Sequence, residues 1–294
     1  LCSNHKTFVG AIDSGAVPVP EYAVTTSLTC DGKLNTFRYL EKKKGVPLTF
    51  LDVPYRDDEA SADYLAEQLK EFTAELERRF GKPFDEEELK NAIRIENETR
   101  RELMRFFKLQ SERYYPGELI SHLYMMMGMH LLIGTQEFLD LIRFMIKDIE
   151  NYPKFDGKKI LWIHLLPFYQ ETLQSYFNSN RKYQIIASDI IIDSMEEMDE
   201  TKPFHALAKK IIRNLYNGCH WGCKQSSGGS ILLKEKLKDM DIPMLILDGD
   251  GIDRRNSHDG QIKTRLEAFL EMLDSGEDRE AEKEETAQRE QKIC

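Results

Sequence analysis

The chain has 294 residues, of which 41% are hydrophobic and 10% aromatic, and this is enough apolar material for one large core or two smaller ones. Its formal net charge of −10 opposes binding to nucleic acid or to an anionic membrane surface, so neither is expected as a partner. The longest apolar stretch, Met125 to Ile133, is far shorter than the roughly 20 residues that a membrane-spanning helix requires.

Five cysteines without a secretory signal are typical of a cytoplasmic protein whose thiols are reduced or bind a ligand. The chain begins with Leu1 and not with methionine, so we expect it to be a fragment whose beginning is missing.

The first half predicts a strand, a helix and a strand, followed by a series of helices. Alternating apolar residues occupy Tyr22 to Leu28 and Pro47 to Val53, each run ending in turn residues. Apolar residues then recur at helical spacing from Glu59 to Phe80, and further helices are expected from Asp85 onward and over Pro116 to Ile133. The methionines of the last helix are interpreted as deformable packing material.

The second half predicts a further parallel sheet after a turn-rich boundary at residues 151–157. Strands are expected at Lys159–Leu165, Gln184–Ile192 and Met244–Leu247, with a helix between the first two and another at Pro203–Tyr216. We therefore predict an α/β protein with two parallel-sheet domains. The domains are residues 1–150, with a helical insertion, and residues 151–273; the charged tail at 274–294 is expected to be a solvated helix or a disordered extension.

One irregularity interrupts this pattern. The helix that ends near Gly218 runs directly into the loop Cys219–Cys223, although ligand-binding loops of doubly wound sheets follow strands. We therefore expect that a helix and a strand are missing between Gly218 and Cys219.

Three cysteines, Cys2, Cys30 and Cys223, lie in turn-like settings beside apolar runs and are the candidate metal ligands. Cys223 precedes a helix, whose amino end stabilises a thiolate. Cys219 is the rival ligand, and Cys294 is expected to be a free thiol. Buried structural thiols are the alternative, and four thiols with Cys219 included could also close a tetrahedral zinc site.

Several other polar residues are candidates with weaker signals. His220 could hydrogen-bond a cluster beside Cys223, and His164 could face a cleft at the end of a strand or lie in the core. Asp248, Asp250 and Asp253 are expected to cap a turn and orient the following arginines, in preference to binding Mg²⁺.

Four strings in order resemble one subunit of the 2-hydroxyacyl-CoA dehydratase and benzoyl-CoA reductase family, and most resemble a beta-type dehydratase subunit. They are TSLTCDG, ILWIHLLPFYQ, CHWGCKQSSGG and IPMLILDGDGIDRRNSHDGQIKTRLEAFLEML, within a likeness from Cys2 to Leu273. The resemblance implies two Rossmann-like (flavodoxin-like) domains and a 4Fe-4S cluster on three cysteines. The family's C-x-x-x-K, C-D and H-x-G-C patterns fall on Cys2 to Lys6, on Cys30-Asp31 and on His220 to Cys223; Cys219 lies outside them.

The same resemblance implies a function. A subunit of this kind eliminates water from a 2-hydroxyacyl-CoA to give the 2-enoyl-CoA through a ketyl radical, as part of an oxygen-sensitive heterodimer. Its partners are the second dehydratase subunit, an ATP-dependent iron-sulfur activator protein and the CoA thioester substrate. A related benzoyl-CoA type reductase and a non-catalytic iron-sulfur or zinc protein remain the alternatives. The acyl group, and whether the cluster binds substrate or relays electrons, stay open.

Overall fold

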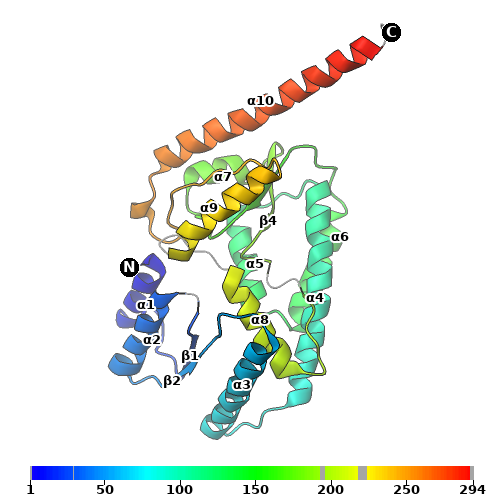
Figure 1. Cartoon of the computed structure of the whole chain (residues 1–294). Coiled ribbons are helices and arrows are strands. Elements are labelled where there is room, and N and C mark those ends of the chain that lie inside the picture. The colour runs from blue at the N-terminus through cyan, green and yellow to red at the C-terminus, as the bar shows by residue number, and fades with distance from the viewer. Residues whose placement is uncertain (1, 29, 193–195, 218–223, 292–294) are drawn as a thin grey trace.

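The computed structural model describes residues 2–28, 30–192, 196–217 and 224–291. This part of the chain is mixed α/β and mostly helical, with two small parallel sheets (Figure 1). In chain order the elements are α1 (Ser3–Asp13), β1 (Ala23–Thr26), α2 (Asp31–Lys44), β2 (Leu48–Leu51), α3 (Glu59–Phe80), α4 (Glu86–Glu112), α5 (Leu119–Leu131), α6 (Gln136–Ile149), β3 (Lys158–Trp162), α7 (Glu171–Phe177), β4 (Tyr183–Ser188), α8 (Pro203–Asn217), α9 (Lys224–Asp239), a 3-10 turn η1 (Arg254–Asn256) and α10 (Asp259–Gln291).

The first sheet pairs β1 and β2 in parallel, with Ala23 opposite Leu48 and Thr26 opposite Leu51. α2 connects the two strands, as the sequence predicted, and α1 packs beside α2 through the stacked rings of Phe8 and Phe37, whose centroids are 6.2 Å apart. Because β1 and β2 run in the same direction, their carboxyl ends lie at the same edge of the sheet. The loop that follows β1 starts at this edge and leads directly to the start of α2. This small core contains Ile12, Ala23, Leu40 and Val46.

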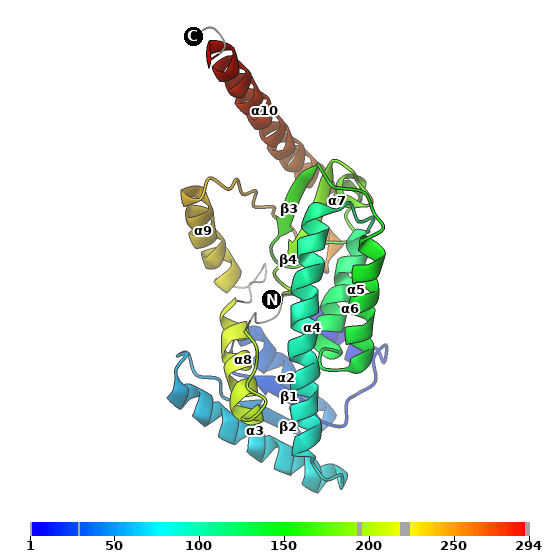
Figure 2. The same cartoon turned by 90° about the vertical axis from the view of Figure 1, so that its right-hand side faces the viewer.

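α3 occupies the residues that its apolar spacing predicted, Glu59–Phe80. The Asp58 carboxylate caps its amino end by accepting from the Ser61 amide at 2.9 Å, and Gly81 ends it with a left-handed φ of 63°. Leu65 and Leu69 lie one turn apart and pack, with β2, against α8. Thus α8, which leads to residue 218, is anchored beside the first sheet although it follows the second sheet in sequence (Figures 1 and 2).

α4, α5 and α6 form a helical layer that runs between the two sheets (Figure 2). α5 and α6 approach closely at Gly128, where a Cβ atom would meet the Phe138 ring at 2.4 Å, so only glycine fits. Met125 and Met126 pack against this core, which confirms their interpretation as packing residues, whereas for Met127, which is 46% exposed, the interpretation is wrong.

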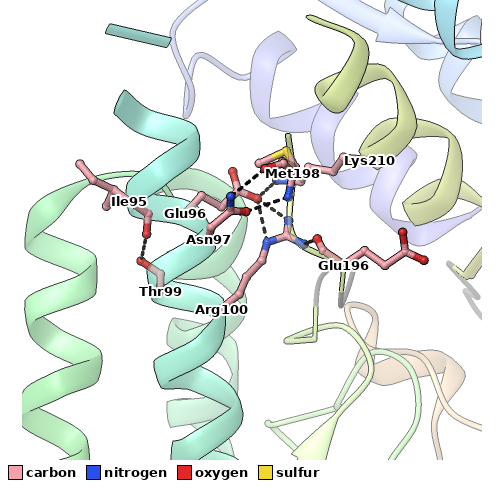
Figure 3. Close-up of polar contacts among 8 residues, drawn as sticks. All are labelled: Ile95, Glu96, Asn97, Thr99, Arg100, Glu196, Met198 and Lys210. Atoms are coloured by element: carbon pink, nitrogen blue, oxygen red, sulfur yellow. Dashed lines mark hydrogen bonds and ion pairs between the residues drawn. The ribbon is translucent and has the colours of Figure 1, made fainter. Parts of the chain in front are cut away.

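A buried polar network joins α4 to α8 and to the segment 196–198 (Figure 3). Glu96 and Arg100 form an ion pair with side chains only 7% and 6% exposed, and Lys210 from α8 donates to the same Glu96 oxygen at 2.6 Å. The Asn97 amide pairs with the backbone of Met198 in both directions, at 2.8 and 2.9 Å. The network therefore fixes the position of α8 through satisfied hydrogen bonds in a low-dielectric setting.

The second sheet pairs β3 and β4 in parallel, with a register shift between Ile160 and Leu161. The prediction of a strand at Met244–Leu247 is wrong, because residues 242–250 have no regular secondary structure. The Ile246 carbonyl accepts from the Arg265 guanidinium at 2.6 Å, while Leu245 and Leu247 pack against the core of this sheet. The segment thus keeps the apolar burial of a strand without the backbone pairing that defines one.

Two strands per sheet in the described part of the chain do not confirm two Rossmann-like domains; the coarser α/β assignment is confirmed. The charged tail continues α10 as a helix to Gln291. Of the described helices, none has the combined length and apolar content needed to cross a membrane.

Candidate functional site

Two of the three predicted cysteine ligands lie at the amino ends of neighbouring helices. Cys2 directly precedes α1 and Cys30 directly precedes α2, in the loop that follows β1. Both thiols are half-buried. The amide groups of a helix's first turn point toward its amino end and carry partial positive charge there, so both sulfur atoms lie beside the positive end of a helix.

His5 connects the two helix ends. It lies one turn after Cys2, and its Nε2 is 3.3 Å from the Cys30 Sγ. The Thr36 hydroxyl donates to the Gly32 carbonyl at 3.1 Å and lies 3.0 Å from the His5 Nδ1. Because that hydroxyl has one hydrogen, it accepts from the Nδ1–H group, and Nε2 is left to face the thiol.

Gly32 makes this arrangement possible. A Cβ atom there would lie 2.9 Å from the imidazole of His5. Any other residue would therefore push the ring away from Cys30.

Lys33 adds positive charge beside Cys30. Its ammonium group donates to the Thr26 hydroxyl and to the Leu28 carbonyl, which folds the side chain back over the loop. Burial lowers the pKa of Lys33, and the nearby Cys30 thiol opposes that shift. Burial, together with the charge of Lys33, lowers the pKa of His5. The Cys30 thiol thus lies among a helix amino end, the His5 imidazole and the Lys33 ammonium group.

The segment around Asp250 contacts the start of α1. The Ser3 hydroxyl donates to the Asp250 carboxylate, and the Asn256 amide donates to the same oxygen at 2.9 Å. Burial by itself would raise the pKa of Asp250, but the hydrogen bonds from Ser3, Asn256 and two backbone amides outweigh it and lower the pKa to about 2. Asp250 is therefore an anion in the folded protein.

Asp250 and Asp253 accept hydrogen bonds from backbone amides of this turn, as predicted, but Asp248 does not. Asp253 accepts from the Arg255 backbone amide at 3.1 Å and binds its guanidinium at 2.7 Å. Asp248 pairs instead with Arg265 at 2.9 Å. In the described part of the chain, no group of three or more histidine, cysteine, aspartate or glutamate side chains is arranged to hold a metal ion.

His164 lies just beyond the carboxyl end of β3 in a strained conformation. Its φ of 84° is in the left-handed region that only glycine adopts freely. The Asp189 carboxylate, just beyond the end of β4, accepts from the His164 amide at 2.7 Å and from the Ile190 amide at 2.8 Å. Burial raises the pKa of Asp189, and these backbone hydrogen bonds oppose the shift. The carboxyl ends of parallel strands are where ligands bind in α/β sheets.

The remaining predicted residues, Cys219, His220 and Cys223, lie outside the described residues. Cys294 also lies outside them. Reasoning from the sequence missed His5, Thr36 and Ser3. A signal for His5 was available, because residues three apart on a helix share a face and His5 follows Cys2 by three. No comparable signal links Ser3 with Asp250, which are 247 positions apart.

Comparison with known proteins supports a single family. The model of the family described as "2-hydroxyglutaryl-CoA dehydratase, D-component" matches residues 1–219 and 217–273. The two matched segments meet where the sequence predicted a missing helix and strand.

Two curated relatives match most of the chain. The (R)-phenyllactyl-CoA dehydratase alpha subunit of Clostridium sporogenes is 22% identical over 302 residues, which cover 90% of this chain and 74% of the relative. The (R)-2-hydroxyglutaryl-CoA dehydratase subunit alpha of Acidaminococcus fermentans is 21% identical over 301 residues, covering 90% of this chain and 62% of the relative. Both relatives are named alpha subunits, whereas the four sequence strings most resemble a beta-type subunit. With the family match extending over nearly the whole folded part, the chain belongs to the 2-hydroxyglutaryl-CoA dehydratase D-component family.

Proposed function

We propose that this chain is one subunit of a 2-hydroxyacyl-CoA dehydratase, a hydro-lyase that removes water from a 2-hydroxyacyl-CoA to give the 2-enoyl-CoA. The observation that carries this proposal is the family match from residue 1 to residue 273. Both long relatives are named dehydratase subunits for CoA thioesters of 2-hydroxy acids, which supports the same substrate class here.

We further propose that Cys2, Cys30 and Cys223 hold a 4Fe-4S cluster, with Cys219 as the rival third ligand. The two described thiols fit this role, because each lies at a helix amino end and Cys30 also has His5 and Lys33 beside it. Bound to these cysteines, the cluster would supply one electron to the substrate thioester; hydroxide would then leave from C2, the β-hydrogen would become acidic and depart as a proton, and the electron would be returned, so that the net reaction is loss of water.

The chain's own residues would then position the cluster and the substrate. His5 orients the Cys30 sulfur, and Thr36 orients His5. His164 and His220 are the candidate catalytic residues. For His164, support comes from its place beyond the end of β3 and from the backbone strain that Asp189 holds there. Strain of this kind, on the order of 1–3 kcal/mol, clusters at functional sites.

The complete enzyme would be a cytoplasmic heterodimer with a second dehydratase subunit, activated by an ATP-dependent iron-sulfur protein. The relatives' names support the partner subunit, because an alpha subunit implies another chain. Within this chain we propose two Rossmann-like domains, at 1–150 and 151–273, followed by the tail at 274–294.

Anaerobic assay of the chain with its partner subunit and activator tests this function. Mass spectrometry should detect loss of 18 mass units, one water, from a 2-hydroxyacyl-CoA, with formation of the 2-enoyl-CoA. Cys223→Ser should lose iron and turnover together, whereas Cys219→Ser should keep most of both; the reverse pattern would reassign the third ligand. Reduction of an aromatic CoA thioester without dehydration would instead identify a reductase.

A further inference from the structure

The first residue of α1 is joined to the loop after residue 248 by a buried hydrogen-bond cluster. Ser3 is 7% exposed and Asp250 is 9% exposed. The Ser3 hydroxyl donates to Asp250 Oδ2, and the Asn256 side-chain amide lies 2.9 Å from that oxygen and 3.3 Å from the Ser3 hydroxyl. A single oxygen of Asp250 therefore accepts hydrogen bonds from the start of α1 and from the turn η1 near the end of the chain.

The rest of its own loop fixes the Asp250 carboxylate. Its Oδ1 accepts from the backbone amides of Ile252 and Asp253, both at 2.9 Å. Its own amide donates to the Ser257 hydroxyl at 3.0 Å, and its carbonyl accepts from the Tyr169 hydroxyl. A carboxylate held from so many directions has little freedom to move, so the position of Ser3 is set by the second half of the molecule.

Cys2 is bonded directly to Ser3, so its Cα lies about 3.8 Å from that of Ser3. An anion at the amino end of α1 also complements the positive end of the helix dipole. Cys30 is held differently: it lies between β1 and α2, and its sulfur contacts His5. The contact with Asp250 thus orients only one of the two described thiols.

We propose that Asp250 is a positioning residue for Cys2, acting through Ser3 to place that thiol relative to the second half of the chain. This inference rests on the proposed function, in which Cys2 is an iron ligand. In this role the loop Asp248–Gly251, from the second half of the chain, positions a cluster ligand that belongs to the side of the first sheet.

Site-specific alkylation of the metal-free chain of 294 residues tests the proposal without any cluster. Iodoacetamide labelling of Cys2 and Cys30 is followed separately by mass spectrometry in Asp250→Asn and Ser3→Ala. Loss of a charge-assisted hydrogen bond should speed labelling of Cys2 by about tenfold or more, with less than about twofold change at Cys30. Ser3→Thr, which keeps the hydroxyl, and Asp253→Asn, which alters a neighbouring carboxylate that caps Arg255, should both label like the unaltered chain.

Anaerobic reconstitution provides a second readout. Asp250→Asn should retain less iron per subunit than the unaltered chain, and Ser3→Thr should restore it. The electron paramagnetic resonance spectrum of the reduced protein should change in Asp250→Asn and remain unchanged in Asp253→Asn.

Unchanged Cys2 labelling in both Asp250→Asn and Ser3→Ala would overturn the proposal. Equal acceleration at both cysteines would also contradict it, because that result indicates general unfolding and not local release. If the unaltered chain binds no iron, the proposed function fails, while the labelling rates still decide whether Asp250 positions Cys2.

Discussion

Removing the charge of Glu96 should destabilise the protein strongly. Glu96→Gln keeps the shape of the side chain but takes away the carboxylate that Arg100 and Lys210 share, and these groups are only 7%, 6% and 16% exposed at the side chain. Two cations would then face each other in a low-dielectric setting with their common anion gone. Breaking a buried ion pair in this way costs about 3–5 kcal/mol.

This loss is large compared with the whole stability of a folded domain, which is about 5–15 kcal/mol. At about 2–4 °C per kcal/mol for a chain of this order of size, the melting temperature should fall by roughly 6–20 °C. Chemical denaturation followed by circular dichroism measures the free energy, and a thermal scan measures the shift.

Glu67→Gln is the matched control, because Glu67 pairs with Lys70 at 2.6 Å on the same kind of helix but with both side chains more than half exposed. An exposed pair contributes about 0–1 kcal/mol, so this variant should unfold nearly like the unaltered chain. Equal, small effects of the two variants would refute the view that the network in Figure 3 holds α8 in place.

Three further outcomes are expected. Folding lowers the pKa of Asp250 from 3.8 to about 2, so its ionised carboxylate stabilises the folded protein by about 2 kcal/mol above about pH 4. This contribution is lost as the pH falls toward 2. The free energy of unfolding of Asp250→Asn should therefore depend less steeply on pH between about 4 and about 2, and an unaltered slope would contradict the assignment. Gly128→Ala forces a methyl group into the Phe138 ring and should destabilise by about 1–3 kcal/mol in urea unfolding, whereas a neutral effect would show that α5 and α6 can move apart. His164→Gly removes a strained φ and should raise stability by up to about 1 kcal/mol while lowering turnover; full turnover would remove His164 from the catalytic candidates.

Local sequence patterns predicted the secondary structure well where a single helix or strand carries its own signal. The helix α3 matches its predicted bounds because its apolar stripe, its Asp58 cap and its terminal Gly81 all agree. The prediction of a strand at Met244–Leu247 was wrong because an apolar run indicates burial and not backbone pairing. Here the Ile246 carbonyl accepts a hydrogen bond from the Arg265 side chain and not from a neighbouring strand.

The site was predictable only in part. The turn-like settings predicted for Cys2 and Cys30 agree with their places directly before helices, but the helix α1 itself was not predicted. The contact between His5 and Cys30 depends on the packing of α1 against α2, which no local pattern encodes. The bond from Ser3 to Asp250 joins residues from opposite parts of the chain, so it follows from tertiary structure alone.

Metal analysis of the anaerobically purified chain tests the central claim most directly. If Cys2 and Cys30 are ligands of an iron-sulfur cluster, the protein should be brown and contain about four irons per subunit, and Cys30→Ser should lose that iron. Colourless protein with one tightly bound zinc per subunit would contradict the cluster and the radical dehydration that depends on it.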